Sequence, residues 1–178
     1  MMDFGPLVFG LGLALLKLIV GLSLAMGSVY LGLKMFDKFT DGADEMAELK
    51  KGNMAVAILL GAIILSIANV VEGGVSSLTN SMVPGLTPLE LLAALFIGVV
   101  NLLLSVVLSI FSIYLAINIL DRITVDIDEF KELRRGNAAV AIVMAAVLFA
   151  VSFVIKGAVA GMAAAISPQS VAMALGGY

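Results

Sequence analysis

The sequence predicts an all-α integral membrane protein. Four transmembrane helices form two parallel two-helix repeats, with short amphipathic helices in the cytoplasmic loops. Of its 178 residues, 62% are hydrophobic and only 13% are charged, whereas soluble domains are about half apolar and about a quarter charged. Four apolar segments each exceed the roughly 20 residues that cross a bilayer. A polar motif also occurs twice, each time before a long apolar run.

The predicted spans cover residues 7–36, 54–80, 88–120 and 138–163. The first differs from a cleaved signal peptide, because it lacks a basic start and Lys17 interrupts its apolar core. It also has an internal counterpart in residues 91–120, so we expect a permanent span. Before the third span, the stretch "TPLE" forms a capping box, with Thr87 as N-cap and Pro88 as the first helical residue.

The doubled motif is "ELKKGNMAVAI" at 48–58 and "ELRRGNAAVAI" at 132–142, an offset of 84 residues. The match is strongest in the polar loop, which chance similarity among apolar residues does not explain. We therefore expect a first two-helix repeat at 1–83 and a second at 84–178, within one compact membrane domain. Two helices per repeat is an even number, so both repeats enter the membrane from the same side and are parallel.

The distribution of Lys and Arg predicts the orientation. These residues flank the two repeat loops, whereas the N-terminus, the linker 81–90 and the C-terminal tail carry none. Because cytoplasmic loops carry an excess of Lys and Arg, we expect both loops in the cytoplasm and both termini outside. The chain would then be a multi-pass protein of the cell (plasma) membrane.

The loop motif predicts a structured turn. Acids early and bases late complement a helix dipole. Gly52 suits the position after a helix and Asn53 the N-cap of the next span, and Gly136 and Asn137 repeat the arrangement. The turn would hold the basic pairs at the lipid headgroups, namely Lys50 with Lys51 and Arg134 with Arg135. Recognition of anionic lipid or of a cytoplasmic partner is the competing interpretation.

Five polar residues lie within the predicted spans: Lys17, Asn69, Glu72, Asn101 and Lys156. A charge at membrane depth costs about 2.5–3.5 kcal/mol on insertion scales, so it needs a partner or a function. The repeat aligns Lys17 with Asn101 and Glu72 with Lys156. At roughly 1.5 Å per residue, all four lie about 30 Å from the inner boundary.

Each of these four residues continues a stripe of small residues, which marks packing faces of membrane helices. We therefore expect a buried polar layer in which Glu72 pairs with Lys17, Lys156 or both, with Asn101 completing it. The layer could be a structural ion pair that fixes helix register, or a site for an ion, proton or anion. Lys17 could instead extend to the outer headgroups.

Composition excludes several classes of site. The chain has no Cys and no His, which removes disulfides, thiolate and imidazole metal sites, and catalysis by either residue. An all-carboxylate metal site stays open. The net charge of −3 and pI near 4.8 argue against nucleic acid. Without a phosphate loop or catalytic motif, we expect no enzyme and no cofactor.

The stretches "DEMAELKKGNMAVAI" and "DEFKELRRGNAAVAI" resemble the YjfL-like membrane family, domain of unknown function 350, in two tandem copies. The resemblance implies a role in membrane maintenance or a membrane complex. Two function classes stay open: a non-enzymatic structural or scaffold subunit, and a small ion, proton or anion channel or transporter. The expected partners are membrane lipids and either further copies of the chain or a membrane-protein complex.

Overall fold

The computed structural model describes residues 5–39, 45–81 and 88–165, and every element in these ranges is a helix. The helices are α1 (Gly5–Phe39), α2 (Glu45–Lys50), α3 (Met54–Ser81), α4 (Pro88–Ile123), α5 (Glu129–Arg134) and α6 (Ala138–Ala165). Helix α4 begins at Pro88, the predicted first helical residue. The predicted cap, Thr87, lies outside the described residues.

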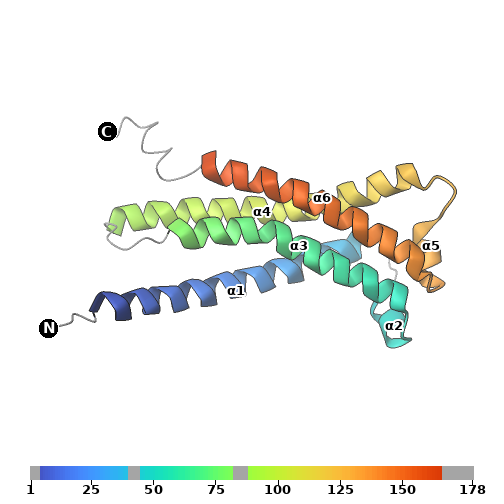
Figure 1. The fold of residues 1–178 in the computed structure, drawn as a ribbon, viewed down its shortest axis with the longest axis horizontal. Coiled ribbons are helices and arrows are strands. Elements are labelled where there is room, and N and C mark those ends of the chain that lie inside the picture. The colour runs from blue at the N-terminus through green and yellow to red at the C-terminus, as the bar shows by residue number, and fades with distance from the viewer. Residues whose placement is uncertain (1–4, 40–44, 82–87, 166–178) are drawn as a thin grey trace.

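The long helices lie along one axis, and the short helices gather at one end (Figure 1). Helices α1 and α4 run toward the end that carries α2 and α5, and α3 and α6 run back from it. The two turn motifs are therefore neighbours in space, although 84 residues separate Asn53 from Asn137.

Helix α3 is the centre of the molecule. It packs along both α4 and α6, and it also contacts α1. Four large side chains of α3 are fully buried, namely Ile63, Ile67, Val70 and Val71. Helix α1 contacts α3 and, to a smaller extent, α4, and it has no comparable packing with α6. The bundle is therefore uneven: α3 is enclosed on several sides, whereas α1 lies at the edge.

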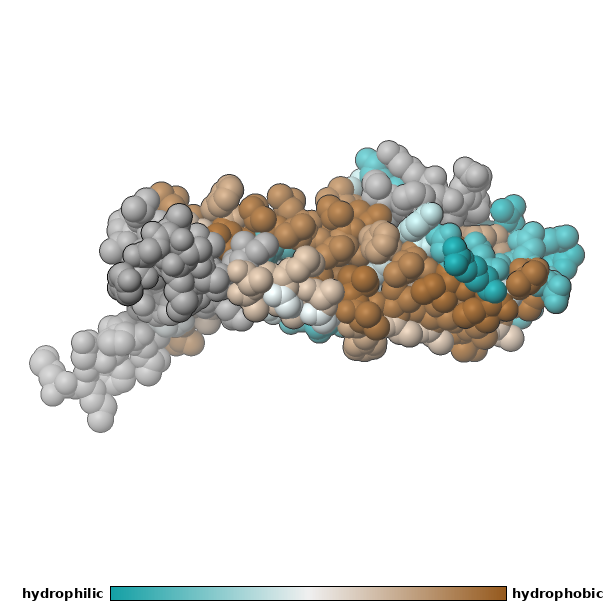
Figure 2. Space-filling view, turned by 90° about the horizontal axis from the view of Figure 1, so that it is seen from above, coloured by the Kyte–Doolittle hydropathy of each residue, from teal (hydrophilic) through white to brown (hydrophobic). Residues whose placement is uncertain are grey.

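On the face of the molecule shown in Figure 2, the long helices are largely apolar, and hydrophilic residues gather at the end that carries the turns. Large apolar side chains of the long helices are widely exposed, such as Phe96 at 72% and Val154 at 73%. So much exposed apolar surface is unfavourable in water and suits a hydrocarbon solvent. The fold is thus that of an all-helical, membrane-embedded protein.

Among the described residues, three helical stretches are long and apolar enough to cross a membrane: Met54–Ser77, Leu92–Ile123 and Ala138–Ala165. The first predicted span, 7–36, yields a shorter apolar stretch within the described residues, Leu18–Lys34. The structure therefore supports three of the four expected spans by length and composition.

Helices α3 and α4 approach closely at Gly74. A Cβ atom at this position would lie 2.8 Å from Ser105 Cβ and 3.0 Å from Leu102 Cα. Because one of these neighbours is backbone, it cannot move aside as a flexible side chain would. Only glycine fits here without separating the two helices, which is the usual reason for small residues at membrane helix contacts.

We predict that Gly74→Ala lowers the free energy of unfolding by about 1–3 kcal/mol, the usual cost of inserting volume into a packed contact. Gly61→Ala, in the same helix, is the matched control, because nothing lies within 4 Å of a Cβ atom at Gly61. Unfolding of both purified variants in lipid bicelles measures the difference. Equal stabilities would contradict the assigned contact.

Candidate functional site

The two turns share one backbone geometry. Gly52 and Gly136 have φ angles of 79° and 81°, in the left-handed region that disfavours side chains. The amide of Gly52 donates to Leu49 O at 2.9 Å, and that of Asn53 donates to Glu48 O at 3.0 Å. The second turn repeats both bonds at 2.9 and 3.0 Å. This pattern closes a helix at a C-terminal glycine, as the sequence predicts.

Each turn asparagine caps the following long helix. Asn53 Oδ1 accepts from the backbone amides of Ala55 at 3.1 Å and Val56 at 3.3 Å. The amide nitrogen of the same side chain donates to the Glu48 carboxylate at 3.0 Å. Asn137 caps α6 in the same way and donates to Glu132 at 2.9 Å. One asparagine thus joins the end of one helix to the start of the next.

The glutamate of each turn is also paired with a basic residue. Glu48 lies 2.6 Å from Lys51, and Glu132 lies 2.8 Å from Arg135. The hydrogen bond from Lys51, and then that from Asn53, lowers the pKa of Glu48. For Glu132, the bond from Asn137 comes first and that from Arg135 second, and both lower its pKa. Both carboxylates therefore stay ionised at neutral pH.

The basic residues of the turns remain accessible. The side chains of Lys51 and Arg135 are 68% and 62% exposed despite their ion pairs. Lys50 and Arg134 are exposed as well. The four side chains are thus available to headgroups or to a partner at the end of the molecule that carries the turns.

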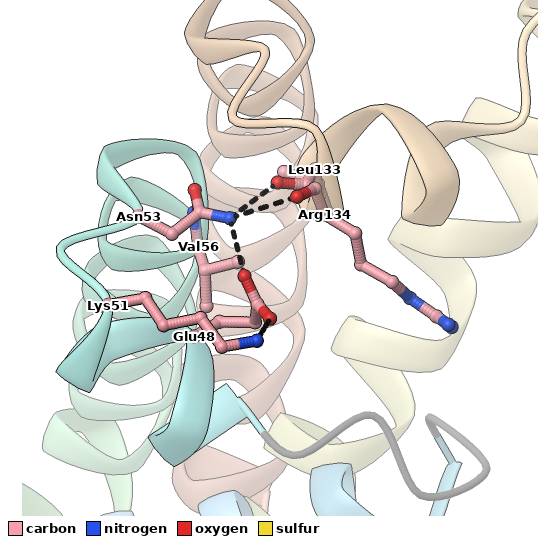
Figure 3. A network of polar contacts seen from close by, with 6 residues as sticks. All are labelled: Glu48, Lys51, Asn53, Val56, Leu133 and Arg134. Carbon is pink, nitrogen blue, oxygen red and sulfur yellow. Dashed lines mark hydrogen bonds and ion pairs between the residues drawn. The ribbon is translucent and has the colours of Figure 1, made fainter.

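The side chain of Asn53 links the two turns to each other. Asn53 Nδ2 also donates to Leu133 O at 2.9 Å, and Arg134 O lies 3.5 Å away (Figure 3). These carbonyls belong to the last turn of α5, so the first repeat holds the loop helix of the second. Leu133 itself is buried, which fixes the acceptor in place.

The start of α5 contains a buried carboxylate. Asp128 caps the helix by accepting from the backbone amide of Lys131 at 3.0 Å. The next residue, Glu129, is only 6% exposed and accepts a hydrogen bond from the Thr124 hydroxyl. This pair was not predicted from the sequence. The repeat could have indicated it, because a Thr and a Glu lie five residues apart in both copies: Thr40 and Glu45 are the equivalents of Thr124 and Glu129.

Within the apolar region, one polar cluster joins α3 to α6. Lys156 Nζ lies 2.8 Å from Glu72 Oε2 and 3.4 Å from Asn69 Oδ1. Asn69 Nδ2 donates to Ser152 Oγ at 3.1 Å, and Ser76 Oγ donates to Glu72 at 2.8 Å. Three of the five residues predicted for the layer, Asn69, Glu72 and Lys156, therefore meet here.

The arrangement differs from the expected buried layer in two respects. The side chains of Glu72 and Lys156 are 55% and 36% exposed, because both lie at the edge of the α3–α6 contact. Asn101 is buried elsewhere and donates to Ser77 Oγ at 2.9 Å, which joins α3 to α4. The side chain of Lys17 lies outside the described residues. The polar residues thus form two separate groups.

A row of buried hydroxyls follows Asn101 along α4, on the stripe of small residues expected to mark a packing face. Ser105, Ser109 and Ser112 of α4 are at most 1% exposed, and each donates to a carbonyl of its own helix. Ser66 Oγ and Asn101 Oδ1 are buried and have no hydrogen-bond partner in the described chain. Among the residues described, no cluster of three or more carboxylates is arranged to hold a metal ion.

We predict that Asn53→Ala destabilises the protein more than Asn137→Ala. Either change removes a helix cap worth about 0.5–2 kcal/mol. Asn53→Ala also removes the bond to Leu133 O, which adds about 0.5–1.5 kcal/mol. Chemical unfolding of the two variants in parallel measures the difference, and equal losses would show that the link between the turns contributes nothing.

We predict that Glu72→Gln lowers the free energy of unfolding by about 1–2 kcal/mol, since it leaves the Lys156 charge unpaired at a half-exposed site. The double variant Glu72→Gln/Lys156→Gln should be more stable than Glu72→Gln alone, because it has no unpaired charge. A double variant less stable than the single one would show that the ion pair is not the relevant interaction. Thermal unfolding of both variants in bicelles decides between these outcomes.

Comparison with known proteins gives one family. Its model, described as Domain of Unknown Function (DUF350), matches twice, over residues 10–107 and 90–177. No curated protein and no solved structure gives a significant match. The two matches run across nearly the whole chain and agree with the tandem resemblance of the two loop motifs. The chain therefore belongs to the DUF350 family and carries two tandem copies of its domain.

Proposed function

We propose that the protein is a non-enzymatic structural or scaffold subunit of the plasma membrane, acting in a homo-oligomer or a membrane-protein complex. In this proposal all four long helices span the bilayer as two parallel repeats. The turns face the cytoplasm and both termini lie outside. Membrane lipids and other copies or subunits are its partners, and no nucleic acid or cofactor takes part.

One observation carries the proposal: Asn69, Glu72, Asn101 and Lys156, polar side chains of the apolar region, each bond to a neighbouring helix. The Lys156–Glu72 ion pair and the Asn69–Ser152 bond tie α3 to α6. The Asn101–Ser77 bond ties α3 to α4. Opposite charges at 2.8 Å neutralise each other and leave no net charge to attract a permeating ion. Such groups fix helix register, which is a structural task.

The exposed basic side chains support the same function. Lys50, Lys51, Arg134 and Arg135 stand together at one end of the molecule, where cytoplasmic headgroups would lie. Juxtamembrane Lys and Arg residues each contribute about 1 kcal/mol of attraction to anionic lipid near the surface. They would hold the subunit at a fixed depth and present the turns to a partner.

A channel or transporter is the second candidate, and the buried hydroxyls favour it. Ser105, Ser109 and Ser112 line one face of α4, and Asn101 Oδ1 and Ser66 Oγ have unused acceptor capacity. Buried polar atoms without partners are uncommon and often mark a water or ion. Four helices enclose little space, so this function would require several subunits.

Flux measurements test the proposal. The purified protein is reconstituted in phosphatidylethanolamine–phosphatidylglycerol vesicles, and H⁺, K⁺ and Cl⁻ fluxes are recorded under an imposed potential. We expect the fluxes to equal those of protein-free vesicles, for the native chain and for Glu72→Gln alike. A flux above that of empty vesicles that disappears in Asn101→Ala or Glu72→Gln would overturn the scaffold function and support transport.

A further inference from the structure

The two repeats bury equivalent positions very differently. On α3, Ala55, Leu59, Ala62, Ser66 and Val70 are at most 3% exposed, and Gly74 is buried too. The equivalent residues of α6, 84 positions later in the chain, are Ala139, Val143, Ala146, Ala150, Val154 and Ala158. All six are exposed, with Val143 at 50% and Val154 at 73%. A surface that is packed in the first repeat is therefore open in the second.

Helix α4 covers the C-terminal end of the buried row on α3. Gly74 lies against Ser105 and Leu102, and Ser77 accepts a bond from Asn101. The contact joins the second helix of one repeat to the first helix of the next. Helix α6 is the second helix of the second repeat, and within the described residues no helix takes the place on α6 that α4 takes on α3.

The other half of this contact is open on α1. Helix α4 buries Ala94 and Leu102, at 2% and 6%, together with Gly98. The equivalent residues of α1 are Gly10, Leu18 and Ala14, and all three are exposed, with Leu18 at 64%. The chain thus carries both halves of its own repeat-to-repeat contact, one on α6 and one on α1, and both are open in the described part of the chain.

We infer that α6 of one chain receives α1 of a second copy, through a head-to-tail repetition of the α3–α4 contact. This inference rests on the homo-oligomeric form of the proposed function. The occupant is a second copy because its α1 carries the aligned counterpart of the α4 residues that already pack against α3. The row on α6 is mostly Ala, which permits close approach, whereas a face that only meets lipid gains nothing from small residues.

The contact is heterologous: one patch of each chain meets a different patch of the next. It therefore predicts a specific pair of neighbours. Ala158 is equivalent to Gly74, and Leu18 is equivalent to Leu102, so Ala158 of one chain should lie beside Leu18 of another. Leu103 follows Leu102 on α4 and is 60% exposed, so it serves as the control position at the same depth.

Disulfide trapping tests the inference cleanly, because the chain has no cysteine of its own. Chains carrying Leu18→Cys and Ala158→Cys, each with a different affinity tag, are co-expressed and oxidised in native membranes. The matched control pairs Leu103→Cys with Ala158→Cys. We expect about tenfold more doubly tagged dimer from the first pair, since only that pair would bring Cβ atoms within the roughly 3.5–4.5 Å of a disulfide.

Equal trapping in both pairs would overturn the inference. A dimer formed mainly between two Ala158→Cys chains would also overturn it, because it would show a symmetric α6–α6 contact.

Ala150→Phe supplies a second measurement. It should leave the unfolding temperature unchanged while the assembled fraction in lipid particles falls about tenfold, and an unchanged assembled fraction would contradict the assigned face.

The outcomes separate this inference from the proposed function. Trapping of Leu18 to Ala158 together with a Glu72-dependent flux would keep the interface and reject the scaffold function. Fluxes equal to those of protein-free vesicles, together with no specific disulfide between the Leu18→Cys and Ala158→Cys chains, would keep the scaffold function and reject the interface.

Discussion

The close contact between α3 and α4 is the constraint on which the rest of the structure depends. It joins the two repeats, and it exists because Gly74 brings the backbone of α3 against Leu102. Helix α3 is then held between α4 and α6, and its central residues are fully buried. The hydrogen bond from Asn101 to Ser77 fixes the position of α4 along the axis of α3. In lipid, where apolar burial does not drive helix association, such packing and hydrogen bonds set the arrangement.

The turns constrain the opposite end of the molecule. Each links one short helix to one long helix through a glycine with positive φ and an asparagine cap. The link from Asn53 to Leu133 O orients the two turns relative to each other. The first repeat is thus tied to the second at its turn and along α3, whereas α1 contacts its neighbours less extensively.

Much of this could be predicted from the sequence. The Gly-Asn turns and the start of α4 follow from local backbone rules, which need no knowledge of distant residues. The meeting of Glu72 with Lys156 follows from the repeat, because equivalent residues lie at equal depth. The exposed fraction of these side chains could not be predicted in this way, because it depends on how much of α1 and α6 the neighbouring helices cover. The burial of Ser105 and Ser112 could be predicted, because both continue the small-residue stripe of Asn101, which marks a packing face.

The ion pair also shows what joining two repeats in one polypeptide makes available. Glu72 and Lys156 occupy the same position in their repeats, yet they carry opposite charges. Two separate copies of the first repeat would bring two carboxylates together at this point, and two copies of the second would bring two ammonium groups together. Because the two repeats are joined in one polypeptide, they could acquire different residues at equivalent positions. The attraction between them distinguishes the correct pairing of halves from either self-pairing.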